Sequence, residues 1–214
     1  MSTRLRVDKL SENALAGYFE KHHRHTYAAK STIINAGDHS STLYYIMRGS
    51  VSVVTEDQDG HEMVLAYLFT GDFFGEIGMF DERHERSAWV RARGECEIAQ
   101  ISYGRIQQLC EDDPNVIFTM LMALSLRVRD TSRKLGDLAF KDVEGRIARA
   151  LLDLCEQPYA KQRVDGVAIE VTRMELGRIV GCSREMASRV LKSMEARGNV
   201  SVSGRTIVVH RGII

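Results

Sequence analysis

The chain lacks the cysteine spacing that a disulfide framework or a metal cluster needs. Its 214 residues include four cysteines, which stand far apart, and no C-x-x-C pair occurs. Small secreted domains and zinc or iron–sulfur sites place their cysteines at short, recurring spacings. We therefore expect no bound metal and reduced thiols at Cys96, Cys110, Cys155 and Cys182.

Long hydrophobic runs are also missing. No stretch approaches the roughly 18 consecutive apolar residues of a membrane span, and the N-terminus has no basic start followed by an apolar run. We expect a cytoplasmic protein. At about 100–200 residues per domain, its length suits one large domain or two modest ones.

The chain has no net charge, but its charges are unevenly distributed. From Ala139 onward there are thirteen Lys and Arg against nine Asp and Glu, so this part carries four excess positive charges and the rest four negative ones. A basic C-terminal part is a weak indication of nucleic-acid binding.

Short β-branched and aromatic runs broken by glycine fill residues 27–101. The strand-like segments include residues 42–47, 51–55 and 63–68, and the chemistry of residues 57–60 suits a hairpin turn. Strands at this spacing favour an antiparallel sandwich or barrel, which can hold one small ligand. The glycines that separate them recur at steps of eleven or twelve residues, at Gly37, Gly49, Gly60 and Gly71.

A heptad pattern predicts a long helix over residues 114–138, which begins after the capping pair Asp113-Pro114. Apolar residues at alternating steps of four and three form a seam that a partner helix would cover. Thr131 is a hydroxyl within that seam, with Ser132 beside it, and it either sets the register of the pair or binds a ligand. The seam consists of Ile117, Leu121, Leu124, Val128, Thr131, Leu135 and Leu138.

A hinge is expected over residues 136–142, because Gly136 weakens the end of the long helix and Asp142 is a suitable N-cap for a helix over residues 143–155. The hinge would separate two domains. We therefore divide the chain into an N-terminal domain (1–113), a central helix (114–138) and a C-terminal domain (139–214).

The last segment has the pattern of a winged helix-turn-helix. Thr172 and Glu175 form a capping box, Gly181 permits a sharp turn, and Ser183 caps a second helix. Two short strands at residues 200–202 and 206–209 would form the wing.

The polar face of that second helix suits base recognition in the major groove. Arg184 and Arg189 can donate to guanine, while Glu185 can accept from cytosine. The alternative is a solvated helix face with an ion pair between Glu185 and Arg189. The preceding capped helix and turn favour DNA binding.

Residues 75–80 and 85–88 form the second candidate site. Gly75 lets backbone N–H groups approach an anion, at the start of a short helix, and Arg86 and Ser87 suit one phosphate. A carboxylate beside an anion needs a reason, and Glu76 has one if it accepts the proton of a sugar hydroxyl in a hydrogen bond. Taken alone, Gly-x-x-Gly is more often a plain turn, but the ordered set is more specific.

These motifs together resemble the bacterial cyclic AMP receptor protein family, in the same order and over most of the chain from about residue 30 to 209. The resemblance rests on residues 75–80 and 85–88, here called the phosphate cassette, on Thr131-Ser132, on the segment 138–140 with Asp142, and on residues 179–185. It implies an α+β protein: an antiparallel, jelly-roll-like β-roll that binds a cyclic nucleotide, a long dimerisation helix, and a winged helix-turn-helix.

The resemblance also implies roles for individual residues. Gly75 and Glu76 would hold ribose and phosphate, Arg86 and Ser87 the cyclic phosphate, and Thr131 the adenine, while Ser132 reaches the partner's pocket. Further pocket residues would be Leu65, Ala66 and Ile77. The DNA-binding set would be Arg173, Ser183, Arg184, Glu185, Arg189 and Lys192, and the hinge would contain Phe140 and Asp142.

The implied protein is a homodimeric, cyclic AMP-responsive transcription regulator that binds pseudo-palindromic double-stranded DNA and recruits RNA polymerase. Ala66 departs from the serine often found at its position in the pocket. One alternative is the same fold with another effector, such as cyclic di-GMP, or with none. Another is a cyclic-nucleotide hydrolase that uses Glu76 and a histidine, although the sequence shows no H-E-x-x-H or comparable metal set.

Overall fold

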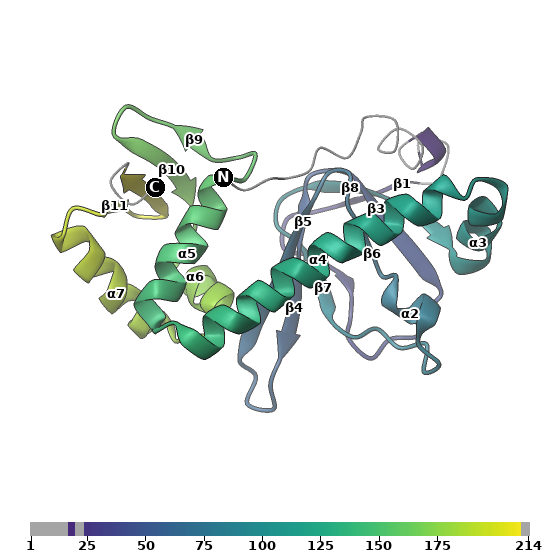
Figure 1. Cartoon of the computed structure of the whole chain (residues 1–214), viewed down its shortest axis with the longest axis horizontal. Coiled ribbons are helices and arrows are strands. Elements are labelled where there is room, and N and C mark those ends of the chain that lie inside the picture. The colour runs from purple at the N-terminus through teal and green to yellow at the C-terminus, as the bar shows by residue number, and fades with distance from the viewer. Residues whose placement is uncertain (1–16, 20–23, 211–214) are drawn as a thin grey trace. The chain divides into compact units, whose positions relative to one another are not determined.

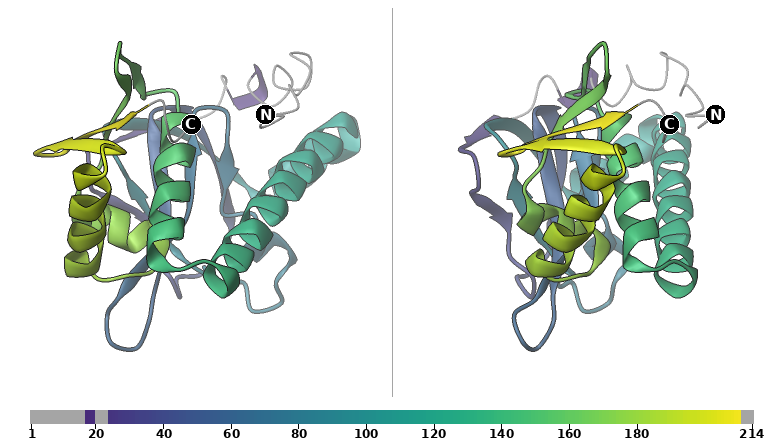
Figure 2. Two further views of the ribbon diagram at one scale, coloured as in Figure 1. Left: turned by 60° about the vertical axis from the view of Figure 1, so that its left-hand side comes forward. Right: turned by 90° about the vertical axis from the view of Figure 1, so that its left-hand side faces the viewer.

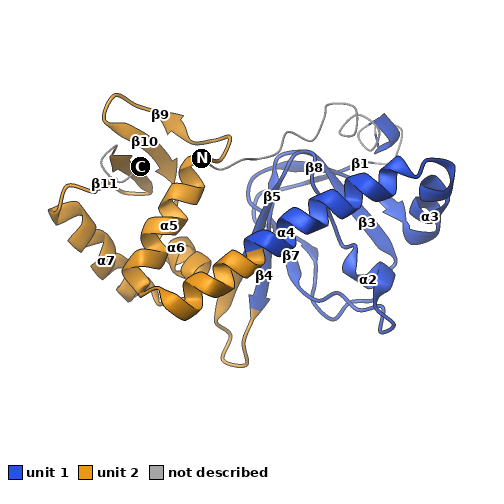
Figure 3. Ribbon diagram, in the orientation of Figure 1, with its two compact units in different colours: residues 1–55, 65–130 blue, residues 56–64, 131–214 orange. Residues whose placement is uncertain are grey.

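The computed structural model describes residues 17–19 and 24–210 of the 214-residue chain. The chain forms two compact units (Figure 3). The first comprises residues 1–55 and 65–130, and the second residues 56–64 and 131–214. The division falls inside the long helix, between Asp130 and Thr131.

The first unit contains two four-stranded antiparallel sheets, and the expected strands are confirmed (Figure 1). One sheet has the order β1 (Arg24–Tyr27), β8 (Cys96–Ser102), β3 (Thr42–Arg48) and β6 (Phe73–Phe74). The other has the order β2 (Thr32–Ile34), β7 (Trp89–Ala92), β4 (Ser50–Glu56) and β5 (Glu62–Phe69).

The alternation of side chains along each strand divides the core of this unit into two layers. On β3, Ile46 joins a cluster to which both sheets contribute, including Val51 and Val90. Its neighbours Leu43 and Tyr45 face the other way, into a cluster with helices α3 and α4. The first sheet is therefore covered on both faces.

The β4–β5 hairpin turns where the sequence predicts, and its Asp57 shapes the turn. The Asp57 Oδ1 atom accepts hydrogen bonds from the backbone N–H groups of Asp59 and His61, both at 2.9 Å. The bond from His61 is the main reason why the pKa of Asp57 lies below its ordinary value. The four recurrent glycines all have positive φ, as expected for turns.

The short helix α2 (Ile77–Phe80) lies between β6 and β7, and the last strand, β8, is followed by α3 (Tyr103–Asp112) and the long α4 (Asn115–Phe140). Helix α3 was not expected from the sequence. The side chain of Asp113 accepts from the backbone N–H of Asn115 at 3.0 Å, which confirms the predicted start of α4.

The long helix ends two residues later than predicted, at Phe140, while the hinge expected over residues 136–142 stays a prediction. Helix α4 continues to Phe140, so that only Lys141 and Asp142 of the expected hinge are non-helical. Gly136 costs a helix only about 1 kcal/mol. The backbone N–H of Lys141 donates to the carbonyl of Asp137 at 3.0 Å, and their side chains form an ion pair at 2.8 Å, which together extend the helix.

The second unit contains three further helices and a four-stranded antiparallel sheet of order β11-β12-β10-β9. In Figure 2 the last helix, α7, leads into the β11–β12 hairpin, which is the predicted wing. The helices are α5 (Val143–Cys155), α6 (Arg173–Val180) and α7 (Arg184–Ala196), and the strands are β9 (Lys161–Gln162), β10 (Gly166–Glu170), β11 (Val200–Ser203) and β12 (Thr206–His210).

The predicted fold class is confirmed: an antiparallel β-roll, a long helix and a winged helix-turn-helix make an α+β protein. Side chains cap all three helices of the second unit as expected, with Asp142, Thr172 and Ser183 accepting from backbone N–H groups. Within residues 17–19 and 24–210, no helix is both long enough and apolar enough to cross a bilayer.

Candidate functional site

The phosphate cassette forms around a glycine that lies against an arginine. Gly75 follows β6 with φ 84°, and a Cβ atom built there would lie 2.6 Å from Nη1 of Arg86 and 3.1 Å from the carbonyl oxygen of Thr42. A side chain at this position would displace the guanidinium, so the glycine is required for close approach. The structure thus brings together Gly75 and Arg86, as the sequence predicted.

Arg86 is a buried cation with no carboxylate partner among the described residues. Only 8% of the residue is exposed. Its guanidinium donates to the carbonyl oxygens of Gly75 (3.0 Å) and Thr42 (2.8 Å) and to the hydroxyl of Tyr103 (3.2 Å). A buried charge is costly unless an opposite charge meets it, so this arginine is suited to hold an anion.

Glu76, the next cassette residue, does have a cationic partner. Its Oε1 atom lies 3.2 Å from Nη1 of Arg127 on α4, and the two side chains are only 11% and 22% exposed. Arg127 also donates to the carbonyl of Phe73, and its guanidinium lies 4.7 Å from the centre of that ring. The ion pair joins the cassette to helix α4.

The other predicted pocket residues differ in exposure. Ser87 is exposed next to the buried Arg86, Leu65 is 41% exposed on β5, and its neighbour Ala66 packs against the core between the sheets. Ile77, the first residue of α2, is 54% exposed. All of them belong to the first unit, together with Gly75, Glu76 and Arg86.

Helix α7 presents the predicted DNA-binding residues to solvent. Its buried face includes Ala187, Leu191 and Met194, and packs on the rest of the unit. The first helix, α6, ends at Gly181, whose φ of 68° and ψ of 52° form the left-handed cap that the helix-turn-helix turn requires. The exposed residues on and before α7 are Ser183, Arg184, Glu185, Arg189 and Lys192.

Arg173 lies at the start of α6, where its guanidinium donates to the carbonyl of Gly204 at 3.3 Å. Gly204 is the turn residue of the β11–β12 wing. The bond places a cation between the first helix and the wing.

Two family models match the chain, and together they span most of it. A cyclic nucleotide-binding domain matches residues 24–113, and a Crp-like helix-turn-helix domain matches residues 145–211. The chain is also 55% identical, over 87% of its length and 89% of the relative, to a cAMP-activated global transcriptional regulator, Vfr, of Pseudomonas aeruginosa. The chain belongs to the Crp family of transcription regulators.

Further Crp-family relatives agree with this assignment. The cAMP-activated global transcriptional regulator CRP of Salmonella typhimurium is 50% identical over 88% of this chain and 90% of its own. Among solved structures, the c-di-GMP responsive global regulator CLP of Xanthomonas campestris matches with a TM-score of 0.86 and 41% identity, covering 92% of this chain and 98% of its own.

The Crp-family seam on α4 is exposed, as a surface that pairs with another helix must be. Of its seven predicted members, six are exposed and Leu124 is half-buried against the core of the first unit. Thr131 and Ser132 are both exposed, at the start of the part of α4 that belongs to the second unit. Their contact with a nucleotide stays a prediction.

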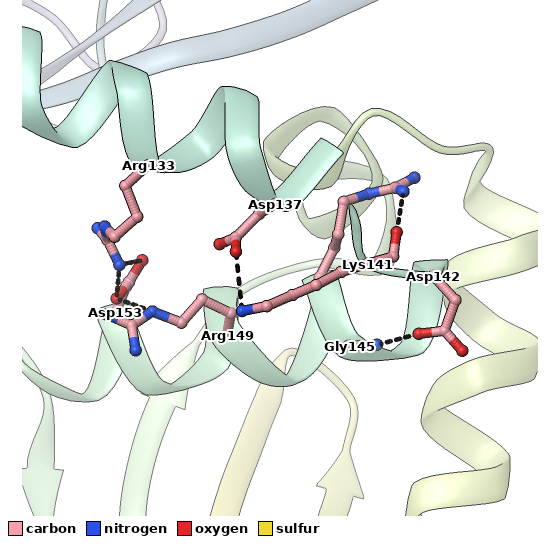
Figure 4. Close-up of polar contacts among 8 residues, drawn as sticks. Arg133, Asp137, Lys141, Asp142, Gly145, Arg149 and Asp153 are labelled. Carbon is pink, nitrogen blue, oxygen red and sulfur yellow. Dashed lines mark hydrogen bonds and ion pairs between the residues drawn. The ribbon is translucent and has the colours of Figure 1, made fainter. Parts of the chain in front are cut away.

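Charged side chains join the end of α4 to α5 within the second unit (Figure 4). Nη1 of Arg133 lies 3.0 and 3.1 Å from the two carboxylate oxygens of Asp153, and Nε of Arg149 lies 3.2 Å from Oδ1 of the same residue. Arg146 donates to the carbonyl oxygens of Lys141 and Val180, each at 3.0 Å. It therefore ties the link between α4 and α5 to the end of α6.

Sequence reasoning missed two residues that support the cassette, Arg127 and Tyr103. Arg127 follows Val116, Met120 and Ala123 at helical spacing on the inner face of α4, and a charge on an apolar face was a signal for a buried partner. Tyr103 begins the helix that the sequence did not predict, so no local pattern pointed to it.

Proposed function

We propose that this Crp-family protein is a cyclic AMP-responsive transcription regulator that acts as a cytoplasmic homodimer on pseudo-palindromic DNA and recruits RNA polymerase. The observation that carries the proposal is the buried guanidinium of Arg86. Three of its five N–H groups have acceptors within the described part of the chain, which leaves two for a ligand. Two parallel N–H groups match two oxygens of one phosphate.

The remaining cassette residues suit the ribose that a cyclic nucleotide carries next to its phosphate. The carboxylate of Glu76 is held in place by Arg127 and has further lone pairs that can accept a hydrogen bond from a sugar hydroxyl. The hydroxyl of Ser87 is exposed beside Arg86 and can donate to the same phosphate. Thr131 would bind the adenine amino group, with Ser132 serving the partner's pocket, and Leu65, Ala66 and Ile77 would line the base.

The homodimer is supported by the apolar surface that α4 exposes. Val128 and Leu135 are 65% and 68% exposed, which is unusual for side chains of this size unless a partner covers them. Their heptad spacing requires a partner helix with the same pattern, and a second copy of this chain has it.

DNA recognition would come from α7. Arg184, Glu185 and Arg189 lie on one exposed face, and the two recognition helices of a dimer would enter major grooves about 34–36 Å apart. Arg173 and Lys192 would contact phosphates, with Ser183 at the cap. A carboxylate on a surface that faces phosphates is unfavourable, which supports a base contact for Glu185.

Cyclic AMP would be an effector and not a substrate. The carboxylate of Glu76 is already bonded to Arg127 and is poorly suited to act as a base. The relatives named above are transcription regulators.

Calorimetry with cyclic AMP and with cyclic di-GMP tests the effector. We expect cyclic AMP to bind, because its single phosphate matches the single guanidinium, that of Arg86, which is buried without a carboxylate partner among the described residues. We expect no binding of cyclic di-GMP. Arg86→Ala should abolish binding, while Arg83→Ala, an exposed arginine in the same loop, should not. Equal binding by the two variants, or preference for cyclic di-GMP, would contradict the assignment.

The same protein then tests the regulation. DNA selected from a random library in the presence of cyclic AMP is titrated with and without the nucleotide, and the nucleotide is recovered afterwards. We expect tighter binding with cyclic AMP and unchanged nucleotide. Equal affinity in both conditions would rule out gating, and recovery of AMP would indicate a hydrolase.

A further inference from the structure

Two hydroxyl groups, those of the half-buried Tyr103 and the buried Ser40, lie next to one another beside Arg86, and the proposed function does not use either of them. Tyr103 is the first residue of α3, and Ser40 precedes β3 with only 2% of its surface exposed. The two hydroxyls are hydrogen-bonded to each other, and both belong to the first unit.

The chemistry of these groups decides the direction of each hydrogen bond. A tyrosine hydroxyl has one proton to donate and two lone pairs. The carbonyl of Gly75 can only accept, so the proton of Tyr103 goes to it, at 2.5 Å. The guanidinium of Arg86 can only donate, at 3.2 Å, so it takes one lone pair. Ser40 must therefore donate to the other, and the hydroxyl of Tyr103 is fully occupied.

The cassette packs directly on this pair of hydroxyls. A Cβ atom built on Gly78 would lie 2.1 Å from Oγ of Ser40 and 3.0 Å from the hydroxyl of Tyr103. A Cβ atom built on Gly75 would likewise lie 2.6 Å from Nη1 of Arg86. The two cassette glycines thus rest on the arginine and on the hydroxyls that hold it.

These bonds determine which N–H groups of Arg86 are left for an anion. Nη1 is occupied by the carbonyl of Gly75 and the hydroxyl of Tyr103, and Nη2 uses one N–H on Thr42. Without the tyrosine hydroxyl, one N–H of Nη1 loses its acceptor. The guanidinium can then turn toward a ligand in more than one orientation.

We propose that Tyr103, supported by Ser40, is a positioning residue that presents one edge of the Arg86 guanidinium to the cyclic phosphate. The inference rests on the proposed function, because it assumes that a cyclic nucleotide is the ligand. It adds that the pair sets how the two remaining N–H groups of Arg86 are oriented toward the two exocyclic phosphate oxygens.

Calorimetry with cyclic AMP and its two phosphorothioate diastereomers tests this role, since each diastereomer replaces a different exocyclic oxygen with sulfur. We expect Tyr103→Phe to bind cyclic AMP about tenfold more weakly and to lose much of the discrimination between the diastereomers. Ser40→Ala should have the same two effects but smaller ones, because it leaves Tyr103 in place and removes only the donor to one lone pair of the tyrosine hydroxyl.

Tyr27→Phe is the matched control. It removes another tyrosine hydroxyl of the first unit, which accepts from Gln100 at 2.9 Å and has no bond to Arg86. It should leave both the affinity and the discrimination unchanged. A general loss of packing would lower affinity without changing the ratio between the diastereomers.

Failure of the inference is distinct from failure of the proposed function. If the unaltered protein binds no cyclic nucleotide, the proposed function is wrong and the inference falls with it. If the unaltered protein binds and Tyr103→Phe keeps the same affinity or the same diastereomer ratio, the positioning role alone is overturned. Should Tyr103→Phe not fold, Ser40→Ala decides by the same criterion.

Discussion

Arg127 carries a positive charge on the inner face of α4, where its neighbours on the helix are apolar. Its partner, Glu76, lies 51 residues earlier in the chain. The pair satisfies both charges away from most of the solvent. Removal of one partner from such a pair leaves the other charge unpaired, which costs more than the pair itself contributes.

At this residue we predict that Arg127→Gln lowers the free energy of unfolding by about 2–3 kcal/mol. Urea denaturation measures the change. The control is Arg129→Gln, because Arg129 is exposed two residues further along the same helix. Replacement of both charged partners, Glu76→Gln with Arg127→Gln, should restore part of the loss. If the Arg127 and Arg129 variants are equally stable, the buried ion pair does not contribute as described.

The residues of the pocket differ in how far the sequence could predict them. Gly75, Glu76 and Arg86 were predicted because their types and order suit an anion and a sugar. Tyr103 and Arg127 were missed because each contacts the cassette only through the tertiary fold: the tyrosine is 28 residues from Gly75 in the chain, and the arginine is 51 residues from Glu76. Local spacing carries no record of such contacts.

Among the elements, α7 combines a buried apolar face with an exposed face of mixed charge. Glu185 is the unusual member, since it adds a negative charge to a surface that should meet phosphates. Glu185 and Lys192, a proposed phosphate contact on the same helix, therefore serve as separate probes of base recognition and of affinity.

For this helix we predict that Glu185→Ala relaxes the preference at one base pair by about 1–3 kcal/mol while it leaves or raises affinity for unrelated DNA. Lys192→Ala, at a proposed phosphate contact, should instead weaken binding to most sequences. Competition between single-base variants of the selected site measures both effects. Glu170→Ala removes an exposed carboxylate at the end of β10 and serves as the control. A uniform change across all sequences for Glu185→Ala would argue against a base contact.

The boundaries of α4 show where element prediction stopped. The heptad pattern predicted the helix and its start because Asp113 and the apolar seam are local signals. Its end was misplaced because Gly136 was given too much weight. The ion pair of Asp137 with Lys141 and the bonds of Arg146 outweigh one glycine, and the second of these depends on α6.

For the whole molecule, the proposed gating requires that ligand binding and pairing of α4 meet at Thr131. We predict that Thr131→Ala leaves the dimer intact but reduces the gain in DNA affinity on addition of cyclic AMP by about tenfold. Sedimentation measures the dimer, and titration of the selected DNA measures the gain. Thr119→Ala, on the same helix, removes a hydroxyl that only bonds the carbonyl of Asn115 and should change neither.

A normal response of the Thr131 variant would assign its hydroxyl to the register of the helix pair alone. The same outcome would leave the cassette as the whole of the effector site.

The two compact units are connected through a continuous helix, because their boundary lies between Asp130 and Thr131 within α4. A flexible linker would let either unit tumble independently. It would keep the units close together but would transmit no rotation from one to the other. A helix resists twisting about its own axis. A rotation of the helix at one end is therefore transmitted to its other end. Only Lys141 and Asp142 separate α4 from α5, and the ion pair of Arg133 with Asp153 also joins the two helices. Each residue inserted in a helix adds a fixed rotation about its axis. Insertion of one or two residues in α4 would thus rotate one unit relative to the other, while each unit stays folded.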